Sequence, residues 1–350
     1  MKPLSGITVL DLTRLLPGGV ATQKLVEWGA EVIKIEQPGS GDYARTMAPA
    51  VFSRTNSGKK SVAIDLKQER GRELLLAMAE RADVLIEGNR PGVMARLGLS
   101  YPEVCARHPR IIYVSLTGYG QEGPFVDLAG HDINYLALGG VLGLNLPVIP
   151  GIQIADLVGG SMQAELGILL ALQERQRTGR GRHVDVSMFA GVVSLLTVPL
   201  AVHAETGKEV RTGGERLSGA YACYEIYRCA DDRWVAVGAL EPKFWAELCK
   251  RLGCEDLVPL QFTEGDQQAA VKARVAGIFE TKPAAVWFDE LRNSDCCVTL
   301  VRTIGEVAAE LAPHSGPPPP RLGQHSREVL ENWGIGGAEI EELRRTGVIA

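Results

Sequence analysis

Short apolar segments alternate with segments of helical spacing through the first half of the chain. The apolar segments have the length and the branched side chains of buried strands, and they lie at 7–12, 31–35, 61–66, 83–87, 111–116 and 182–186. Between several of them, apolar residues recur three and four positions apart, as at 18–28 and 69–81. Strands that alternate with helices favour a mainly parallel sheet. The pattern therefore predicts a large α/β domain with a Rossmann-like parallel sheet.

The pattern changes after Leu200. Residues 221–228 and 234–237 flank a polar turn and predict a β-hairpin, and helical spacing follows at 242–252 and 283–292. A hairpin followed by helices predicts a smaller α+β domain.

The predicted domain boundaries follow these changes of pattern. The large domain covers 1–200 and the small domain covers 215–312. The segments 201–214 and 313–320 are expected to be linkers, the second of them rich in proline and semi-rigid. A charged helical tail at 320–350 is expected to dock on the large domain and complete it.

The charge of the chain excludes a general attraction to polyanions. With 37 Lys and Arg against 42 Asp and Glu, the formal net charge is -5, which gives no broad basic surface for nucleic acid or anionic membranes. An anionic ligand would need a local basic pocket. The candidate cations for such a pocket are Lys59, Lys60, Lys67 and Arg90.

Cysteine usage and apolar runs indicate the compartment. The seven cysteines include no CxxC pair, which favours reduced thiols over a disulfide framework. No apolar run reaches the ~20 residues that a membrane span needs, and the first residues lack the apolar core of a signal peptide. We therefore expect a cytoplasmic protein without a membrane span.

One imidazole and one carboxylate stand beside glycines at predicted element boundaries. His131 follows the glycine-rich loop 118–124 and should begin a helix at the rim of the sheet, where the helix N-terminus disfavours the imidazolium. Asp156 precedes a long helical segment with Gly159 and Gly160 in its first turn. An N-cap role explains this aspartate about as well as a functional one, although such glycines usually permit close approach of a ligand or backbone.

A second carboxylate, Glu241, stands directly before Pro242. Proline favours the first helical position, so a carboxylate at a helix start is the default interpretation of Glu241. A catalytic role for it is secondary on local grounds. Together with His131 and Asp156 it nevertheless completes the groups that move a proton from carbon, namely a base near neutral pKa and a second acid or base. The sequence therefore predicts an enzyme.

The start of the chain invites a dinucleotide-binding interpretation, which the glycines do not support. The segment 16–21 lacks GxGxxG spacing, no GxxxxGK[ST] occurs, and the histidines show no HExxH or similar metal spacing. A nucleotide moiety could still bind through Lys67 and Arg90, which stand where predicted strands end. We expect no metal and no redox cofactor.

Several long motifs occur in one order along the chain. They are LSGITVLDLT, GAEVIKIEQPGSGD, GKKSVAIDLK and EGNRPGVMARLGL. With them, nearly the whole chain resembles the class III CoA-transferase (CaiB/BaiF) family. The motifs AGHDINYLALGG and GALEPKFWAEL, with Asp156, resemble its α-methylacyl-CoA racemase branch. Transferases of the family usually carry tyrosine in place of His131 and glutamine in place of Leu136.

The resemblance implies a substrate, an assembly and a set of site residues. The substrate would be an acyl-CoA thioester, and the assembly an interlocked homodimer whose active site includes the partner's small domain. His131 and Asp156 would be the acid/base groups on opposite faces of the substrate α-carbon, with Glu241 partnering His131. Backbone N–H groups near Asp156 would hold the enolate oxygen. CoA, which is part of the substrate and not a separate cofactor, would lie against Ile64, Asp65, Leu66, Lys67, Asn89, Arg90, Gly130, Asp132 and Tyr135.

The leading prediction is a racemase that inverts C2 of 2-methyl-branched acyl-CoA thioesters through an enolate. The runner-up is transfer of CoA between carboxylic acids through an aspartyl-CoA intermediate on Asp156. Two departures from the racemase pattern bear on this choice: the segment 142–153 is shorter than the racemase loop, and Gln37 stands where racemases often place an arginine against a CoA phosphate. The short segment also admits a CoA-ester binding protein without turnover. A dinucleotide oxidoreductase ranks last.

Overall fold

The computed structural model describes residues 1–311 and 316–350, which form two units. The first unit comprises 1–142, 146–197 and 316–350, and the second comprises 143–145 and 198–311. The linker expected at 313–320 begins on residues that lie outside the described part of the chain. Each unit has a hydrophobic core of its own.

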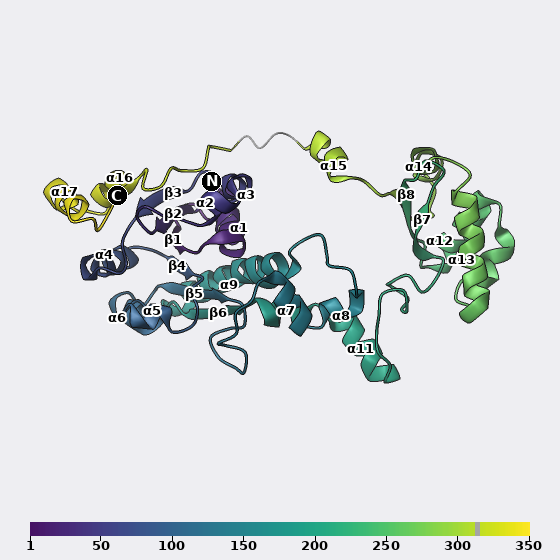
Figure 1. The fold of residues 1–350 in the computed structure, drawn as a ribbon, viewed down its shortest axis with the longest axis horizontal. Coiled ribbons are helices and arrows are strands. Elements are labelled where there is room, and N and C mark those ends of the chain that lie inside the picture. Colours follow the sequence, from purple (N-terminus) through teal and green to yellow (C-terminus); the bar gives the residue numbers. More distant parts are fainter. Residues whose placement is uncertain (312–315) are drawn as a thin grey trace. The chain divides into compact units, whose positions relative to one another are not determined.

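The first unit is built on a parallel sheet. Its strands are β1 Thr8–Leu12, β2 Glu31–Glu36, β3 Lys60–Ala63, β4 Val84–Glu87, β5 Ile112–Thr117 and β6 His183–Ser187. They form a 6-stranded sheet in the order β3-β2-β1-β4-β5-β6 (Figure 1). This is the order of a doubly wound nucleotide-binding sheet, and the predicted α/β class is confirmed. The strand order reverses between β1 and β4, and ligands of such folds bind at the carboxyl ends of the strands there.

Helices cover both faces of this sheet because successive strand residues point to opposite sides. Leu10 and Ile33 belong to one core, whereas Val9 and Val32 belong to the other. The helices whose buried residues join the first core include α4 Glu69–Ala79, α6 Tyr101–Arg107, α16 Ser326–Asn332 and α17 Gly337–Arg345. Those that join the second include α1 Leu15–Glu27, α7 Asp132–Leu138, α9 Gln163–Thr178 and α10 Met188–Ser194.

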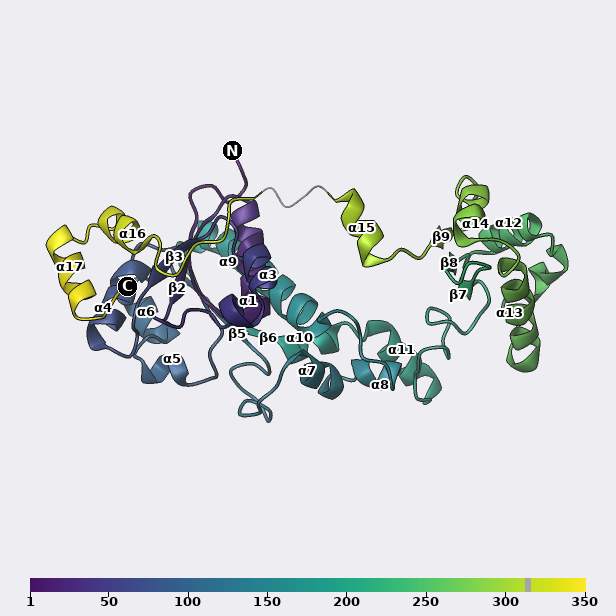
Figure 2. The same cartoon turned by 45° about the horizontal axis from the view of Figure 1, so that its top comes forward.

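The C-terminal tail is part of the first unit. In Figures 1 and 2, α16 lies beside β3, and Val329 and Leu330 are buried in the core that also contains Ile64. Ile349 forms an antiparallel bridge with Ile64. The tail thus contributes to the core on one face of the sheet.

The second unit has an antiparallel sheet in the order β7-β8-β9, formed by Tyr224–Arg228, Trp234–Gly238 and Val298–Leu300. The predicted hairpin is confirmed by the pairing of the first two strands. The helices α12 Pro242–Leu252, α13 Gly265–Phe279 and α14 Ala284–Leu291 contribute to its core. The aromatic side chains buried there include Trp245, Phe279 and Trp287.

Shorter elements complete the described chain. They are α2 Ala44–Met47, α3 Pro49–Thr55, α5 Val93–Arg96, α8 Val141–Asn145, η1 Ala155–Met162, α11 Thr197–Thr206, η2 Glu255–Leu260 and α15 Ile304–Glu310. The segment expected to be a linker at 201–214 therefore begins as helix α11. Leucine and alanine are strong helix formers, and Leu200, Ala201 and Ala204 extend the helix into this segment.

One helical stretch of the described residues, Ala155–Thr178, is long and apolar enough to cross a membrane by length and composition. An apolar window of 18 residues within this stretch is 44% buried inside the protein, where α9 packs against β5 and β6. The bent pair α10 and α11 passes the same test only when the two helices are joined. Core helices of α/β domains have the same composition.

Candidate active site

A cavity of about 620 Å³ lies where the strand order of the sheet reverses. Its walls are the segments that follow three strands, namely 13–18 after β1, 88–91 after β4 and 118–120 after β5. His131 and Asp156 both line this cavity. The fold therefore brings two of the three predicted catalytic residues into one space.

His131 is the N-cap residue of α7, so the predicted helix start is confirmed. Its backbone is extended, and its N–H donates to Asn134 Oδ1 at 3.0 Å. A polar side chain three residues into a helix often satisfies the N-cap N–H in this way. The imidazole is exposed on the cavity side and can reach a ligand.

Asp156 lies in the first turn of η1, which is a π-helix that runs directly into α9. The N-cap position belongs to Ile154, so the N-cap interpretation of Asp156 is wrong. The adjoining glycines serve helix packing: a Cβ on Gly159 would lie 2.5 Å from the Met188 carbonyl oxygen, and one on Gly191 would lie 2.4 Å from the Gly159 backbone. They permit the close approach of another backbone, that of α10.

The environment of Asp156 favours its protonated form. Burial, with the carboxylate of Asp132 nearby, raises the pKa of Asp156 to about 6, although His131 opposes the shift. Asp132 Oδ1 accepts the backbone N–H of Asp156 at 3.0 Å and so holds the two acidic residues together. A carboxyl group with a pKa near neutral can accept and return a proton at pH 7. The same hydrogen bond occupies the N–H of Asp156, which is therefore unavailable to an enolate oxygen.

An aromatic group forms another wall of the cavity. Tyr135 is buried and its hydroxyl donates to the Gly130 carbonyl at 2.7 Å. Burial and the nearby Asp156 carboxylate raise the pKa of Tyr135 to about 12, which keeps the phenol neutral. The ring of Tyr119 lies edge-on to Tyr135 with centroids 5.1 Å apart. The wall is thus largely aromatic, and the hydroxyl of Tyr135 is already hydrogen-bonded within it.

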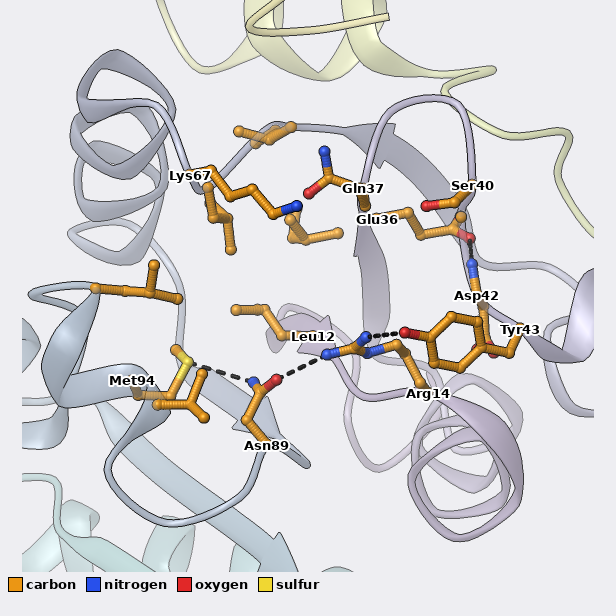
Figure 3. A pocket seen from close by; sticks show the side chains of 16 residues that line it. Leu12, Arg14, Glu36, Gln37, Ser40, Asp42, Tyr43, Lys67, Asn89 and Met94 are labelled. Carbon is orange, nitrogen blue, oxygen red and sulfur yellow. Dashed lines mark hydrogen bonds between the residues drawn. The ribbon is translucent and has the colours of Figure 1, made fainter.

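A second cavity, of about 390 Å³, lies beside the first (Figure 3). Arg14 lines this cavity, and its guanidinium group donates to Tyr43 Oη at 3.1 Å and to Asn89 Oδ1 at 2.8 Å. Arg14 and Asn89 line both cavities, which therefore adjoin. Lys67 and Gln37 point into the smaller one.

The family model of CoA-transferase family III matches residues 4–315. The chain belongs to CoA-transferase family III. It is 36% identical over 382 residues to the alpha-methylacyl-CoA racemase of Homo sapiens, covering 99% of this chain and 97% of that one. It is also 36% identical over 323 residues to the acetyl-CoA:oxalate CoA-transferase of Acetobacter aceti, covering 87% and 82%.

Solved structures agree with this assignment. A CAIB/BAIF family protein from Brucella suis shares the fold with a TM-score of 0.80 and 25% identity, over 95% of this chain and 99% of that one. The resemblance to the CaiB/BaiF fold is confirmed. The chain is an enzyme of a family that contains both racemases and CoA-transferases.

The residues expected to contact CoA divide between the two cavities of this family III enzyme. Ile64, Leu66, Lys67 and Asn89 line the smaller cavity, and Asn89, Arg90, Gly130 and Tyr135 line the larger one. Asp65 and Asp132 line neither. Asp65 accepts the side-chain N–H groups of Gln37 and Gln68, both at 3.1 Å. Asp132 holds the Asp156 backbone instead.

Two of the four cations proposed for a basic pocket are already paired. Lys59 is buried against Asp11 with its Nζ 3.2 Å from Oδ2, and Lys60 bridges the carboxylates of Glu31 and Glu328. The charge of each is therefore used within the fold. Lys67 and Arg90 remain beside the cavities.

Arg14 was missed by the sequence analysis. Its signal was present, because a cation directly after the first strand of a parallel sheet lies at the ligand-binding edge. Glu241 is the N-cap residue of α12 in the second unit, with Pro242 at the first helical positions, as its default interpretation predicted. Its pairing with His131 stays a prediction.

The raised pKa of Asp156 has a consequence for stability. Its pKa is higher in the folded state than the ordinary 3.8, so ionisation between these values destabilises the fold, and the full cost is present above the folded pKa of about 6. We expect Asp156→Asn to raise the free energy of unfolding at pH 8 by about 1–3 kcal/mol, and to raise it by a smaller amount at pH 5. Denaturant titrations at both pH values measure the difference. Asp127→Asn, an exposed aspartate of the same unit, is the matched control, and an equal gain at both pH values would contradict the shift.

Proposed function

We propose that this family III enzyme is a racemase that inverts C2 of 2-methyl-branched acyl-CoA thioesters. One observation carries the proposal: His131 and Asp156 line the same cavity, and the pKa of Asp156 is raised to about 6. Inversion needs two groups that can each remove and return a proton near neutral pH. An imidazole and a carboxyl group with a raised pKa meet this need.

The proposed reaction is a proton transfer on each face of one carbon. Either Asp156 or His131 takes the C2 proton of the thioester, the C–H electron pair moves into an enolate, and the other group gives a proton to the opposite face. Asn134 lines the cavity, and its carboxamide oxygen already accepts the His131 N–H. Its NH₂ group is therefore our candidate donor to the enolate oxygen. Such donors contribute roughly 3 kcal/mol each when they are positioned in advance.

The two adjoining cavities suit the two ends of the substrate. We assign the CoA nucleotide to the smaller cavity and the thioester to the larger one, with Arg14 and Asn89 where they meet. An interlocked homodimer and a cytoplasmic location belong to the same proposal. All seven cysteines are free, as a reducing compartment would require.

Arg90 provides a test of the binding assignment. Arg90 follows Asn89, which lines both cavities, and we place a CoA phosphate where the cavities meet. We expect Arg90→Ala to weaken CoA binding by about 10-fold, because a charge-assisted contact to this phosphate is lost. Arg96 is exposed and lines neither cavity, so Arg96→Ala is the matched control. Isothermal titration calorimetry with CoA measures both. An unchanged affinity in Arg90→Ala would exclude this residue as a phosphate contact.

A second candidate function is CoA transfer between carboxylic acids. The 36% identity to an acetyl-CoA:oxalate CoA-transferase supports it, since it equals the identity to the racemase, although over fewer residues. Asp156 would attack the thioester carbonyl and expel the CoA thiolate, which leaves a mixed anhydride between Asp156 and the acyl group. The thiolate would then attack the aspartyl carbonyl, release the donor carboxylate and form an aspartyl-CoA thioester, from which CoA passes to the acceptor carboxylate by the same steps in reverse. Mass spectrometry of the protein after incubation with acyl-CoA separates the two functions. A hydroxylamine-sensitive adduct on Asp156 supports transfer, whereas the racemase forms none.

A further inference from the structure

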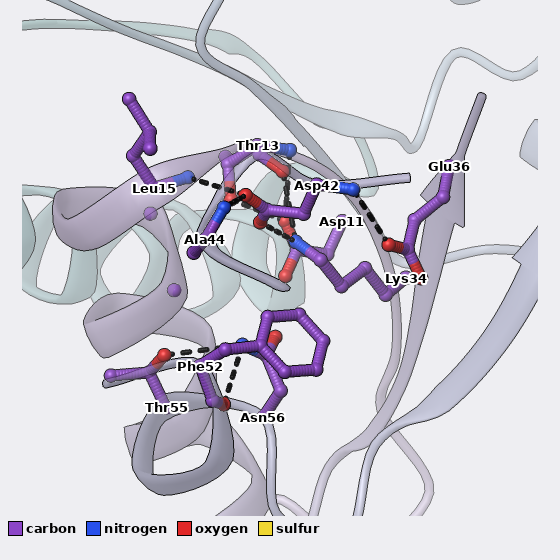
Figure 4. Close-up of polar contacts among 12 residues, drawn as sticks. Asp11, Thr13, Leu15, Lys34, Glu36, Asp42, Ala44, Phe52, Thr55 and Asn56 are labelled. Carbon is purple, nitrogen blue, oxygen red and sulfur yellow. Dashed lines mark hydrogen bonds and ion pairs between the residues drawn. The ribbon is translucent and has the colours of Figure 1, made fainter. Parts of the chain in front are cut away.

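A cluster of buried charges lies next to the segment 13–18 that lines the larger cavity (Figure 4). Lys34 Nζ lies 2.9 Å from Asp42 Oδ2, and the side chains are 0% and 1% exposed. Asp11 and Lys59 are paired nearby and are also fully buried. Burial alone would raise the pKa of Asp11, but Lys34 and Lys59 outweigh it and lower that pKa to about 2. Buried ion pairs are weak stabilisers compared with apolar side chains, so their position calls for another explanation.

The cluster holds a strained piece of backbone. Leu15 has a φ of 62°, a left-handed conformation that side chains other than glycine rarely adopt. Asp42 Oδ1 accepts the Leu15 N–H at 3.0 Å, and Lys34 Nζ donates to the Thr13 carbonyl at 2.9 Å. Asp11 Oδ1 accepts the Thr13 N–H at 2.9 Å. The backbone on both sides of Arg14 is therefore fixed by buried charged groups.

The far end of the same segment is linked to the helix that carries Asp156. Ser161 is fully buried in η1, with its Oγ 2.7 Å from the Pro17 carbonyl oxygen and 3.1 Å from the Asp156 carbonyl oxygen. One hydroxyl hydrogen can serve either carbonyl. A shift of the segment 13–18 would therefore reach the backbone of Asp156 through Ser161.

We infer that Asp42 and Lys34 are positioning residues that hold Leu15 in its left-handed conformation and so set the cavity wall and the backbone of Asp156. They act through Leu15 and Ser161 and not on the reacting atoms. The effect on turnover rests on the proposed role of Asp156. The effect on the backbone does not.

Hydrogen–deuterium exchange of the full-length protein tests the backbone effect without any assay of turnover. Asp42→Ala should speed exchange of the amides in 13–18 and in η1, whereas Asp42→Asn, which keeps an acceptor oxygen for the Leu15 N–H, should speed it less. Asp83→Ala is the matched control. It removes a partly buried ion pair with Arg175 at the start of β1, where Asp83 accepts the Thr8 N–H, and it should leave both segments unchanged. Equal exchange of 13–18 in wild type and Asp42→Ala would overturn the inference.

Turnover tests the functional consequence. Asp42→Ala should lower kcat by at least about 10-fold, since small misplacements of catalytic groups are costly. Adding Leu15→Gly should restore about 3-fold or more of it, because glycine adopts a positive φ without strain. If Asp42→Ala lowered kcat only through a general loss of stability, adding Leu15→Gly would lower kcat further. The same further loss is expected when Leu15→Gly is added to Asp83→Ala. If Asp42→Ala does not fold, Asp42→Asn with and without Leu15→Gly gives the same comparison. No restoration in the double variant would overturn the inference, whereas a wild type without turnover would refute the proposed function alone.

Discussion

We expect Asp156→Ala to lower racemisation of a 2-methylacyl-CoA by at least about 100-fold, because one proton transfer at C2 then lacks its acid or base. The CoA contacts that we assign to Arg14, Asn89 and Lys67 lie elsewhere in the two cavities. Affinity for free CoA should therefore stay within about 3-fold of wild type. A chiral assay of the acyl group gives kcat, and calorimetry gives the affinity.

Two further variants make this result specific. Asp127→Ala removes an exposed carboxylate of the same unit and should leave kcat unchanged. Asp132→Asn keeps an acceptor for the Asp156 N–H but removes the charge that helps to raise the pKa of Asp156. In the plot of kcat against pH, the apparent pKa of the limb that reports Asp156 should therefore be lower in this variant than in wild type. A folded Asp156→Ala protein with more than about a tenth of wild-type kcat would show that the assignment is wrong.

The second large effect concerns His131. We expect His131→Ala to lower racemisation by at least about 100-fold while C2 exchange persists for one enantiomer only. The reason is geometric: with one group on each face of the carbon, Asp156 can still remove and return the proton that faces it. Proton NMR in D₂O, run on each pure enantiomer, measures the two exchange rates separately.

His203→Ala is the control for this experiment. His203 is an exposed histidine of α11 in the second unit, with its Nδ1 2.8 Å from the Lys208 carbonyl oxygen. Its removal should change neither exchange rate. Racemisation retained by His131→Ala, or equal losses of exchange for both enantiomers, would refute the assignment of His131 to one face.

The periodicity of the sequence was sufficient for the parallel sheet and for the hairpin of the second unit, but it did not predict the short strand β9 Val298–Leu300. Buried strands such as Ile112–Thr117 appear as short, mostly apolar segments, and the hairpin of the second unit appears as two such segments around a polar turn. The π-helix was not predictable. In the sequence its glycines resemble those of a ligand site. In the structure α10 packs against Gly159, and this contact joins segments that are far apart in the sequence.

The same limit applies to charged residues. Lys59 was a candidate cation for an anion-binding pocket, yet its partner Asp11 lies 48 positions away and both are buried. His131 could be predicted as a cavity residue because a glycine-rich loop and a helix start mark it locally, whereas the glycines that drew attention to Asp156 serve helix packing. Arg14 could have been found, because it lies just after the first predicted strand, whereas the hydrogen bond from Asp156 to Asp132 joins two segments whose approach the sequence does not display.

We propose that this enzyme moves a proton at C2 of an acyl-CoA. The decisive measurement is proton NMR of each enantiomer of a 2-methylacyl-CoA in D₂O with the wild-type protein. We predict loss of the C2 proton signal from both enantiomers and their conversion to a common mixture. A CoA ester that binds but keeps its C2 proton in both enantiomers would contradict the claim.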